Sequence, residues 1–187
     1  MAYNSAIKIK PDYYDAYFNL GIAYKANNQL DFAISAYKSA ITIKPDYYQA
    51  FNNLGNAYQV INQLDLAIMA YNSAIKIKPD YYDAYFRLGI AYDANNQRDL
   101  AIMAYNSAIK IKPDYYDAYF NLGIAYKANN QLELAISAYR SAITIKPDYY
   151  QAFYSVGIAH QAINQLDLAI MAYNTAIKIK PNYHQAF

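Results

Sequence analysis

The chain has 187 residues, of which 56% are apolar and 16% are charged, and its formal net charge is +2. A chain of this length and apolar content buries a core, which excludes a disordered polypeptide. The small net charge provides no electrostatic footprint for nucleic acid or for a membrane surface, so neither partner is expected.

The sequence contains no cysteine, which excludes disulfides, thiolate metal sites and cysteine nucleophiles. No apolar run reaches the roughly 18 residues that a membrane span needs. Met1 is followed almost at once by a repetitive pattern, so no signal peptide is expected. These features favour a cytoplasmic protein, and neither a cofactor nor a metal is expected.

A proline returns every 34 residues along the whole chain, with nearly the same sequence between each pair. The prolines are Pro11, Pro45, Pro79, Pro113, Pro147 and Pro181. Their spacing predicts a single array over 1–187, with full repeats at 11–44, 45–78, 79–112, 113–146 and 147–180 and partial helices at 1–10 and 181–187. Such arrays usually present one long surface rather than a catalytic pocket.

Each repeat is expected to begin with an amphipathic helix. In the first repeat, Asp12 follows Pro11 and is expected to cap the helix, with Asp15 completing a capping box. Apolar and small side chains then recur at spacings of three and four residues over 16–24, which is typical of one helical face. This first helix is expected to end near residues 27–28.

An asparagine follows the first helix in every repeat, and a positive φ is expected there because asparagine tolerates the left-handed conformation that reverses a chain. These asparagines are Asn28, Asn62, Asn96, Asn130 and Asn164. A second helix is expected over about 30–43, where Pro45 ends it. Small residues such as Gly21 leave space for tyrosines such as Tyr37. Ten full helices in antiparallel pairs, without strands, are therefore predicted.

The repeat resembles the tetratricopeptide repeat, in which an aromatic residue, Leu-Gly, a tyrosine, an alanine, an aromatic residue and a proline recur over 34 residues. The first repeat supplies Tyr17, Leu20, Gly21, Tyr24, Ala33, Tyr37 and Pro45. The fifth departs at Val156 and His160. The resemblance covers almost the whole chain. It implies an all-α fold, a right-handed superhelical solenoid of antiparallel helix pairs whose concave groove holds a peptide or a partner's helix.

The segment Phe-Asn-Leu-Gly at 18–21 is also similar to the superhelical repeats of O-GlcNAc transferases. In those proteins a ladder of asparagines binds the backbone of an extended polypeptide. The resemblance implies rungs at Asn19, Asn53 and Asn121, interrupted at Arg87 and Ser155. It leaves open that the chain is the substrate-recruiting region of a larger glycosyltransferase-like protein.

The candidate groove residues lie on the first helices outside the packing stripe. They are Phe18, Asn19, Ile22, Lys25, Asn52, Asn53, Asn56, Phe86, Arg87, Ile90, Phe120, Asn121, Ile124, Lys127, Tyr154, Ser155 and Ile158. The four aromatic members are expected to form an exposed row, whereas the isoleucines fit core packing equally well. A clamp for two carboxylates is excluded, because only Asn53 and Arg87 match its positions.

Internal comparison supports a role for this surface. The second and fifth repeats differ at seven positions, and three of these differences fall on groove positions. The three are Asn52/Tyr154, Asn53/Ser155 and Asn56/Ile158. Variation of the groove on a constant scaffold is expected if these side chains select a ligand.

No catalytic constellation is apparent, so the chain is expected not to be an enzyme. Of its two histidines, His160 replaces a packing tyrosine and is expected to be buried, and His184 lies in the terminal segment. We therefore expect a protein-interaction scaffold that binds an extended peptide or a partner helix.

The alternative is a structural array that associates with itself head to tail. Both ends cut through the repeat pattern, as expected for part of a longer array or for an engineered, consensus-like one. Apolar side chains at the two ends would then meet; they are Tyr3, Ala6 and Ile7 at one end and Ile170, Tyr173 and Ile177 at the other.

Overall fold

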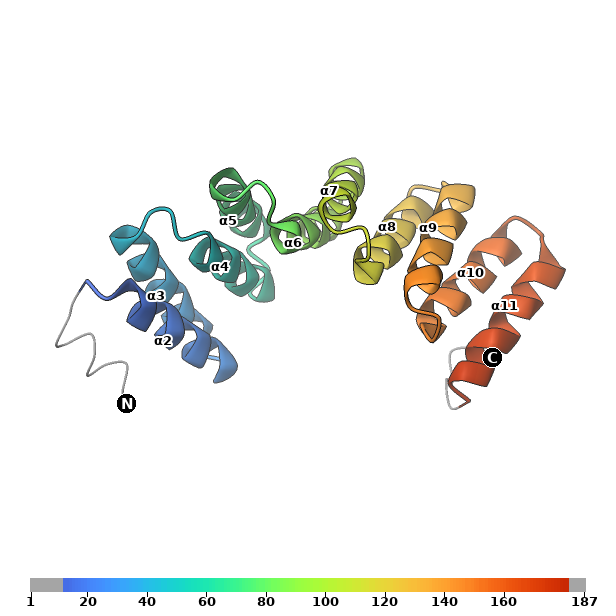
Figure 1. Cartoon of the computed structure of the whole chain (residues 1–187), viewed down its shortest axis with the longest axis horizontal. Coiled ribbons are helices and arrows are strands. Elements are labelled where there is room, and N and C mark those ends of the chain that lie inside the picture. Colours follow the sequence, from blue (N-terminus) through green and yellow to red (C-terminus); the bar gives the residue numbers. More distant parts are fainter. Residues whose placement is uncertain (1–11, 182–187) are drawn as a thin grey trace. The chain divides into compact units, whose positions relative to one another are not determined.

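The computed structural model describes residues 12–181. These residues form ten helices and no strand, as the repeat pattern predicted (Figure 1). The chain divides into two compact units, Met1–Asn95 and Asn96–Phe187, and each is described by itself. The partial helices expected at the two ends lie outside the described residues, apart from Pro181.

The first unit contains five described helices. Helix α2 (Tyr14–Ala26) pairs with α3 (Leu30–Ile43), and α4 (Tyr48–Val60) pairs with α5 (Leu64–Ile77). Helix α6 (Tyr82–Ala94) packs against α5. Helix α4 also contacts α2, α3 and α6, so the three first helices of this unit follow one another along one side.

The second unit contains the other five. Helix α7 (Arg98–Ile111) packs against α8 (Tyr116–Ala128), which pairs with α9 (Leu132–Ile145). Helix α10 (Tyr150–Ala162) packs against α9 and pairs with α11 (Leu166–Ile179). The second helices of the repeats begin and end where the sequence predicted.

The asparagine turns have the predicted conformation. Asn28 has a φ of 57°, and the equivalent residues of the other four repeats have values between 56° and 59°. The Gln29 N–H donates to the Tyr24 carbonyl at 2.8 Å, and the Asn28 N–H donates to the Lys25 carbonyl at 3.0 Å. This bonding pattern satisfies carbonyl groups at the helix end and turns the chain toward the second helix.

The expected aspartate cap is wrong. Helix α2 starts at Tyr14 rather than directly after Asp12, and no side chain caps any of the first helices. The proline and aspartate lie in a turn instead: in the second repeat, the Tyr47 N–H donates to the Lys44 carbonyl at 3.2 Å. Because the proline ring fixes φ at the second position of this turn, the turn determines where the first helix begins.

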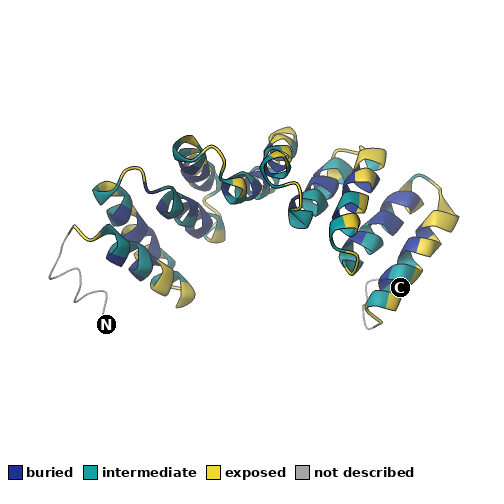
Figure 2. Cartoon of the chain, in the orientation of Figure 1, coloured by how far each residue is buried: buried dark blue, intermediate teal, exposed yellow. Residues whose placement is uncertain are grey.

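The core combines small and large side chains on the facing sides of each helix pair, as predicted (Figure 2). A Cβ atom added to Gly21 would lie 2.5 Å from the Tyr37 ring, and one added to Gly55 would lie 2.6 Å from the Tyr71 ring. Both tyrosines are fully buried. Glycine therefore allows the two helices of a pair to approach to the distance at which the ring fills the space between them.

Candidate functional site

The predicted asparagine ladder is anchored to its own helices. The side-chain amide of each rung donates to the backbone carbonyl four residues earlier, at 2.8 Å from Asn19, 3.0 Å from Asn53 and 2.9 Å from Asn121. The expectation that these amides are free is therefore wrong for one N–H of each. All three side chains remain partly exposed. The bond to the helix holds each amide in one orientation.

The expected exposed aromatic row is wrong in the first unit. The ring centroid of Phe18 lies 4.9 Å from that of Tyr47 and 6.0 Å from that of Tyr37. Phe86 is buried, with only 9% of its surface exposed. The rings fill space between neighbouring helices because two first helices and one second helix meet there. Ile22, by contrast, is 43% exposed, and Ile90 is half-buried.

The second unit requires the same correction. Phe120 lies 4.9 Å from Tyr149 and 5.6 Å from Tyr139 between ring centroids, and Tyr154 lies 5.6 Å from Tyr173. Ile124 packs against the buried cluster that includes Tyr139, and Ile158 is half-buried. These aromatic side chains hold repeats together and offer a ligand only their edges.

Two asparagines of α4 are also buried rather than displayed. Asn52 is 3% exposed, and its amide donates to the Asp83 carboxylate at 3.0 Å. Asp83 in turn accepts a bond from the Arg87 Nε at 3.2 Å. The chain of contacts joins α4 to α6 and fixes the Arg87 side chain, so Asn52 positions a groove residue instead of facing the groove.

Asn56 belongs to a second buried cluster. The Tyr71 hydroxyl lies 2.8 Å from the Asn56 Oδ1 and 2.8 Å from the Gln59 Oε1. A hydroxyl has one proton and donates to one oxygen only, so the other amide must turn its NH₂ group toward the Tyr71 oxygen. The cluster ties α5 to two residues of α4, and Asn56 is left 9% exposed.

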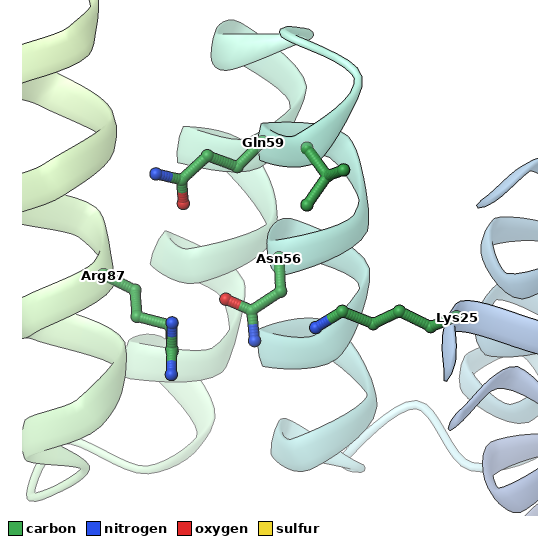
Figure 3. Close-up of a pocket in the computed structure, with 5 residues that line it drawn as sticks. Lys25, Asn56, Gln59 and Arg87 are labelled. Carbon is green, nitrogen blue, oxygen red and sulfur yellow. The ribbon is translucent and has the colours of Figure 1, made fainter. Parts of the chain in front are cut away.

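Above this cluster, side chains of three first helices line a pocket of about 370 Å³ (Figure 3). Its lining consists of Lys25 from α2, Asn56, Gln59 and Val60 from α4, and Arg87 from α6. Lys25 and Arg87 reach into it from opposite sides, as Figure 3 shows. Burial, and secondarily the charge of Arg87, lowers the pKa of Lys25.

In the second unit, the remaining candidates Lys127 and Ser155 are half-buried. Burial raises the pKa of the Tyr139 hydroxyl, and a hydrogen bond with Ser155 offsets part of this effect. Ser155 is thus occupied with a core tyrosine of the preceding repeat.

His160 is buried as expected, with 4% of its surface exposed. Its Nε2 lies 3.3 Å from the Arg140 guanidinium, and its Nδ1 lies 2.7 Å from the Gln165 Oε1. Since the guanidinium only donates, Nε2 accepts and Nδ1 carries the proton that Gln165 receives. This side chain joins α9 to α10 and has a packing role.

The sequence analysis missed a set of exposed apolar side chains on the second helices. They are Phe32, Leu66, Leu100, Leu134, Leu168, Met69, Met103 and Met171, with exposed fractions between 40% and 66%. The signal was present, because each of the first five follows an acidic residue at the start of a second helix and lies off its inner stripe.

Two clefts of similar make-up lie on this side, one in each unit. The cleft in the first unit has a volume of about 200 Å³ and includes Tyr58 and Met69. The cleft in the second has about 230 Å³ and includes His160 and Met171.

Over residues 12–181, no group of three or more His, Cys, Asp or Glu side chains is placed to hold a metal ion. None of the described helices is long and apolar enough to cross a membrane.

Comparison with known proteins agrees with the helix pairs described above. Family models described as TPR repeat match residues 61–96 and 94–130, and models described as tetratricopeptide repeat match residues 14–47, 116–149 and 150–183. The chain is thus an all-α solenoid of helix pairs. It belongs to the tetratricopeptide repeat family. No curated protein sequence matches it significantly.

Solved structures share the fold. The structure of YrrB, described as a TPR protein with an unusual peptide-binding site, has 22% identity and a TM-score of 0.82; the match covers 100% of this chain and 96% of that one. A MamA protein has 28% identity and a TM-score of 0.84, with coverage of 91% and 95%. TTC0263, a TPR protein of Thermus thermophilus, has 17% identity, a TM-score of 0.68 and coverage of 92% and 94%.

Proposed function

We propose that this chain is a protein-interaction scaffold that binds an extended peptide along its first helices. The observation that carries the proposal is the anchoring of Asn19, Asn53 and Asn121. Each amide uses one N–H on its own helix, which leaves the second N–H and the Oδ1 for a ligand. A side-chain amide presents the same donor and acceptor pair as a peptide group, so it can bind a backbone whatever the ligand's side chains are.

The fixed orientation favours binding. A ligand that meets an anchored side chain does not have to immobilise it, and the entropy cost of binding falls accordingly. The likeness to YrrB, which is described as having a peptide-binding site, agrees with this assignment. The resemblance to O-GlcNAc transferase repeats remains a prediction, as do the cytoplasmic location and the single continuous array.

The test replaces all three asparagines by alanine. Binding would be measured with a pool of amidated, acetylated peptides of fixed length, randomised among neutral residues. Loss of three hydrogen bonds of about 1 kcal/mol each would weaken binding by roughly a hundredfold. The matched control replaces Asn72, Asn106 and Asn174, which are exposed on second helices, and should bind as the unaltered protein does.

Two results would contradict the proposal. One is equal binding by the triple variant and the unaltered protein. The other is a large fall in melting temperature in the triple variant, which would show that these asparagines serve the fold.

Self-association is the second candidate function, and the exposure of α11 favours it. Ile170 is 57% exposed, whereas the equivalent residues Ile34 and Ile136 are 8% and 6% exposed against the next repeat. Tyr173 and Ile177 are half-buried. A second copy whose first described helix covered α11 would continue the array without closing it. Replacing Ile170 with lysine should then abolish concentration-dependent association in sedimentation, and a monomer at all concentrations would reject the idea.

A further inference from the structure

We propose that the pocket between α2, α4 and α6 binds one carboxylate group of the partner, held between Lys25 and Arg87. This inference rests on the proposed function, because it assigns a charge requirement to one position of the peptide that lies along the first helices.

Charge is the first argument. Arg87 is the only arginine on a first helix in the sequence, where the other repeats have Asn19, Asn53, Asn121 and Ser155. Its Nε is bound to Asp83, and no other atom of its guanidinium has a partner among the described residues. Lys25 likewise makes no hydrogen bond or ion pair within the described part of the chain.

The acids of the first helices in this unit do not neutralise the pocket. Asp15 accepts the Tyr47 hydroxyl at 3.1 Å, and Asp83 lies on the Nε side of Arg87. Asp93 is not part of the pocket lining. With one acid set against two cations, the local charge is close to +1, which matches one carboxylate rather than a doubly charged phosphate.

Geometry is the second argument. Asn52 holds Asp83, and Asp83 holds Arg87, so the guanidinium is oriented before a ligand arrives. A guanidinium with free Nη groups binds a carboxylate through two parallel hydrogen bonds. The Tyr71 cluster fixes Asn56 and Gln59 at the floor of the pocket, where their amides can bind a neighbouring peptide group.

The shift of Lys25 agrees with both arguments. Burial and the positive charge of Arg87 lower the pKa of Lys25, because neither favours a second cation at this place. A carboxylate between the two side chains would remove this penalty. At about 370 Å³ the pocket lies in the size range of small-ligand sites, which suits one acidic side chain or a chain terminus.

The experiment compares three pools of acetylated peptides that differ at one feature only. The first has a central Gln and an amidated end, the second has a central Glu and an amidated end, and the third has a central Gln and a free terminal carboxylate. We expect one acidic pool to bind about tenfold more tightly than the neutral pool, as one charge-assisted contact would give. The pool that gains identifies the source of the carboxylate. The gain should shrink with added salt, since the pocket is open to solvent.

Three variants locate the effect. Lys25→Gln and Arg87→Gln should each remove most of the preference while leaving binding of the neutral pool. Lys76→Gln changes an exposed lysine of α5 in the same unit and should keep the full preference. Arg87→Lys preserves the charge without the planar group, and should retain only part of the gain.

The outcomes separate this inference from the proposed function. If the neutral pool binds and neither acidic pool gains, the carboxylate site is rejected and the scaffold function stands. If the preference survives in both glutamine variants, the carboxylate lies elsewhere and the site is again rejected. If no pool binds, the scaffold function fails, and the inference fails with it.

Discussion

Helices α4 and α10 belong to repeats that differ at only seven positions, yet they present different surfaces. Helix α4 carries Asn52 and Asn56, which bind a neighbouring first helix and the Tyr71 hydroxyl. Helix α10 has Tyr154 and Ile158 at those positions, and Tyr154 packs on Tyr173. The comparison shows that the repeat keeps its backbone while the outer face of the first helix changes from polar networks to apolar packing.

The second helices respond to this change. Tyr71 is fully buried with two amides at its hydroxyl, whereas Tyr173 is half-buried and donates only to Gln161, at 2.8 Å. In the first repeat, where Ile22 and Lys25 occupy the corresponding positions, the buried Tyr37 hydroxyl has no hydrogen-bond partner. The same tyrosine therefore has three different environments in one fold.

The largest effect should come from alkaline pH. Burial raises the pKa of Tyr37 to about 12 and raises that of Tyr71 as well. A raised folded-state pKa means that the stabilisation is complete below the unfolded value near 10 and is lost as pH rises through the folded value. We expect unfolding as pH passes from about 10 toward about 12.

Tyrosinate absorbance and circular dichroism, followed together, check this prediction. The more exposed Tyr173 should ionise before Tyr71, and Tyr173→Phe should remove the earliest part of the absorbance change. Full ionisation of the tyrosines with helicity unchanged would contradict the expected coupling.

Alanine in place of the packing glycine should distinguish the two repeats next. A Cβ on Gly55 would meet the immobile ring of Tyr71, and one on Gly157 would meet Tyr173, which can shift toward solvent. We expect Gly55→Ala to cost about 2 kcal/mol after the gain in helix propensity, and Gly157→Ala to be nearly neutral. Denaturant unfolding with hydrogen exchange resolved by helix would measure both, and equal losses would refute the difference.

Removal of tyrosine hydroxyls tests the three environments. Tyr71→Phe should cost about 1–2 kcal/mol, because it leaves buried amide groups without a partner. Tyr173→Phe should cost less, since its bond is exposed. Tyr37→Phe should be neutral or slightly stabilising, because its hydroxyl has no partner to lose. Thermal and denaturant unfolding of the three variants would show this order, and a costly Tyr37→Phe would reveal a partner for that hydroxyl.

The smallest effect concerns a matched pair between repeats. Lys38 lies 5.8 Å from the centre of the Tyr58 ring, whereas Arg140 binds His160 at 3.3 Å at the equivalent positions. Arg140→Lys and His160→Tyr should each destabilise the second unit, and the double variant should recover about 0.5–1 kcal/mol by recreating the first pair. A double-mutant cycle measures this coupling, and additive losses would show that the pairs are independent.

Sequence alone determined the helix pairs, the residues that end them and the close approach of glycine to tyrosine. These features follow from neighbours along the chain: Asn28 takes its left-handed conformation locally, and Pro45 ends a helix wherever it stands. Repetition also made the inner stripe easy to identify, since five copies gave the same spacing. The start of each helix was misplaced because a turn competed with a cap.

Only the tertiary structure decided which side chains of the first helices face a ligand. Phe18 is covered by Tyr47, which lies 29 residues later, and Asn52 finds Asp83 after 31 residues. Lys25 and Arg87 are 62 residues apart and meet only because α2, α4 and α6 lie in succession. Helical periodicity specifies a face of one helix, but burial depends on what the neighbouring helices place against that face.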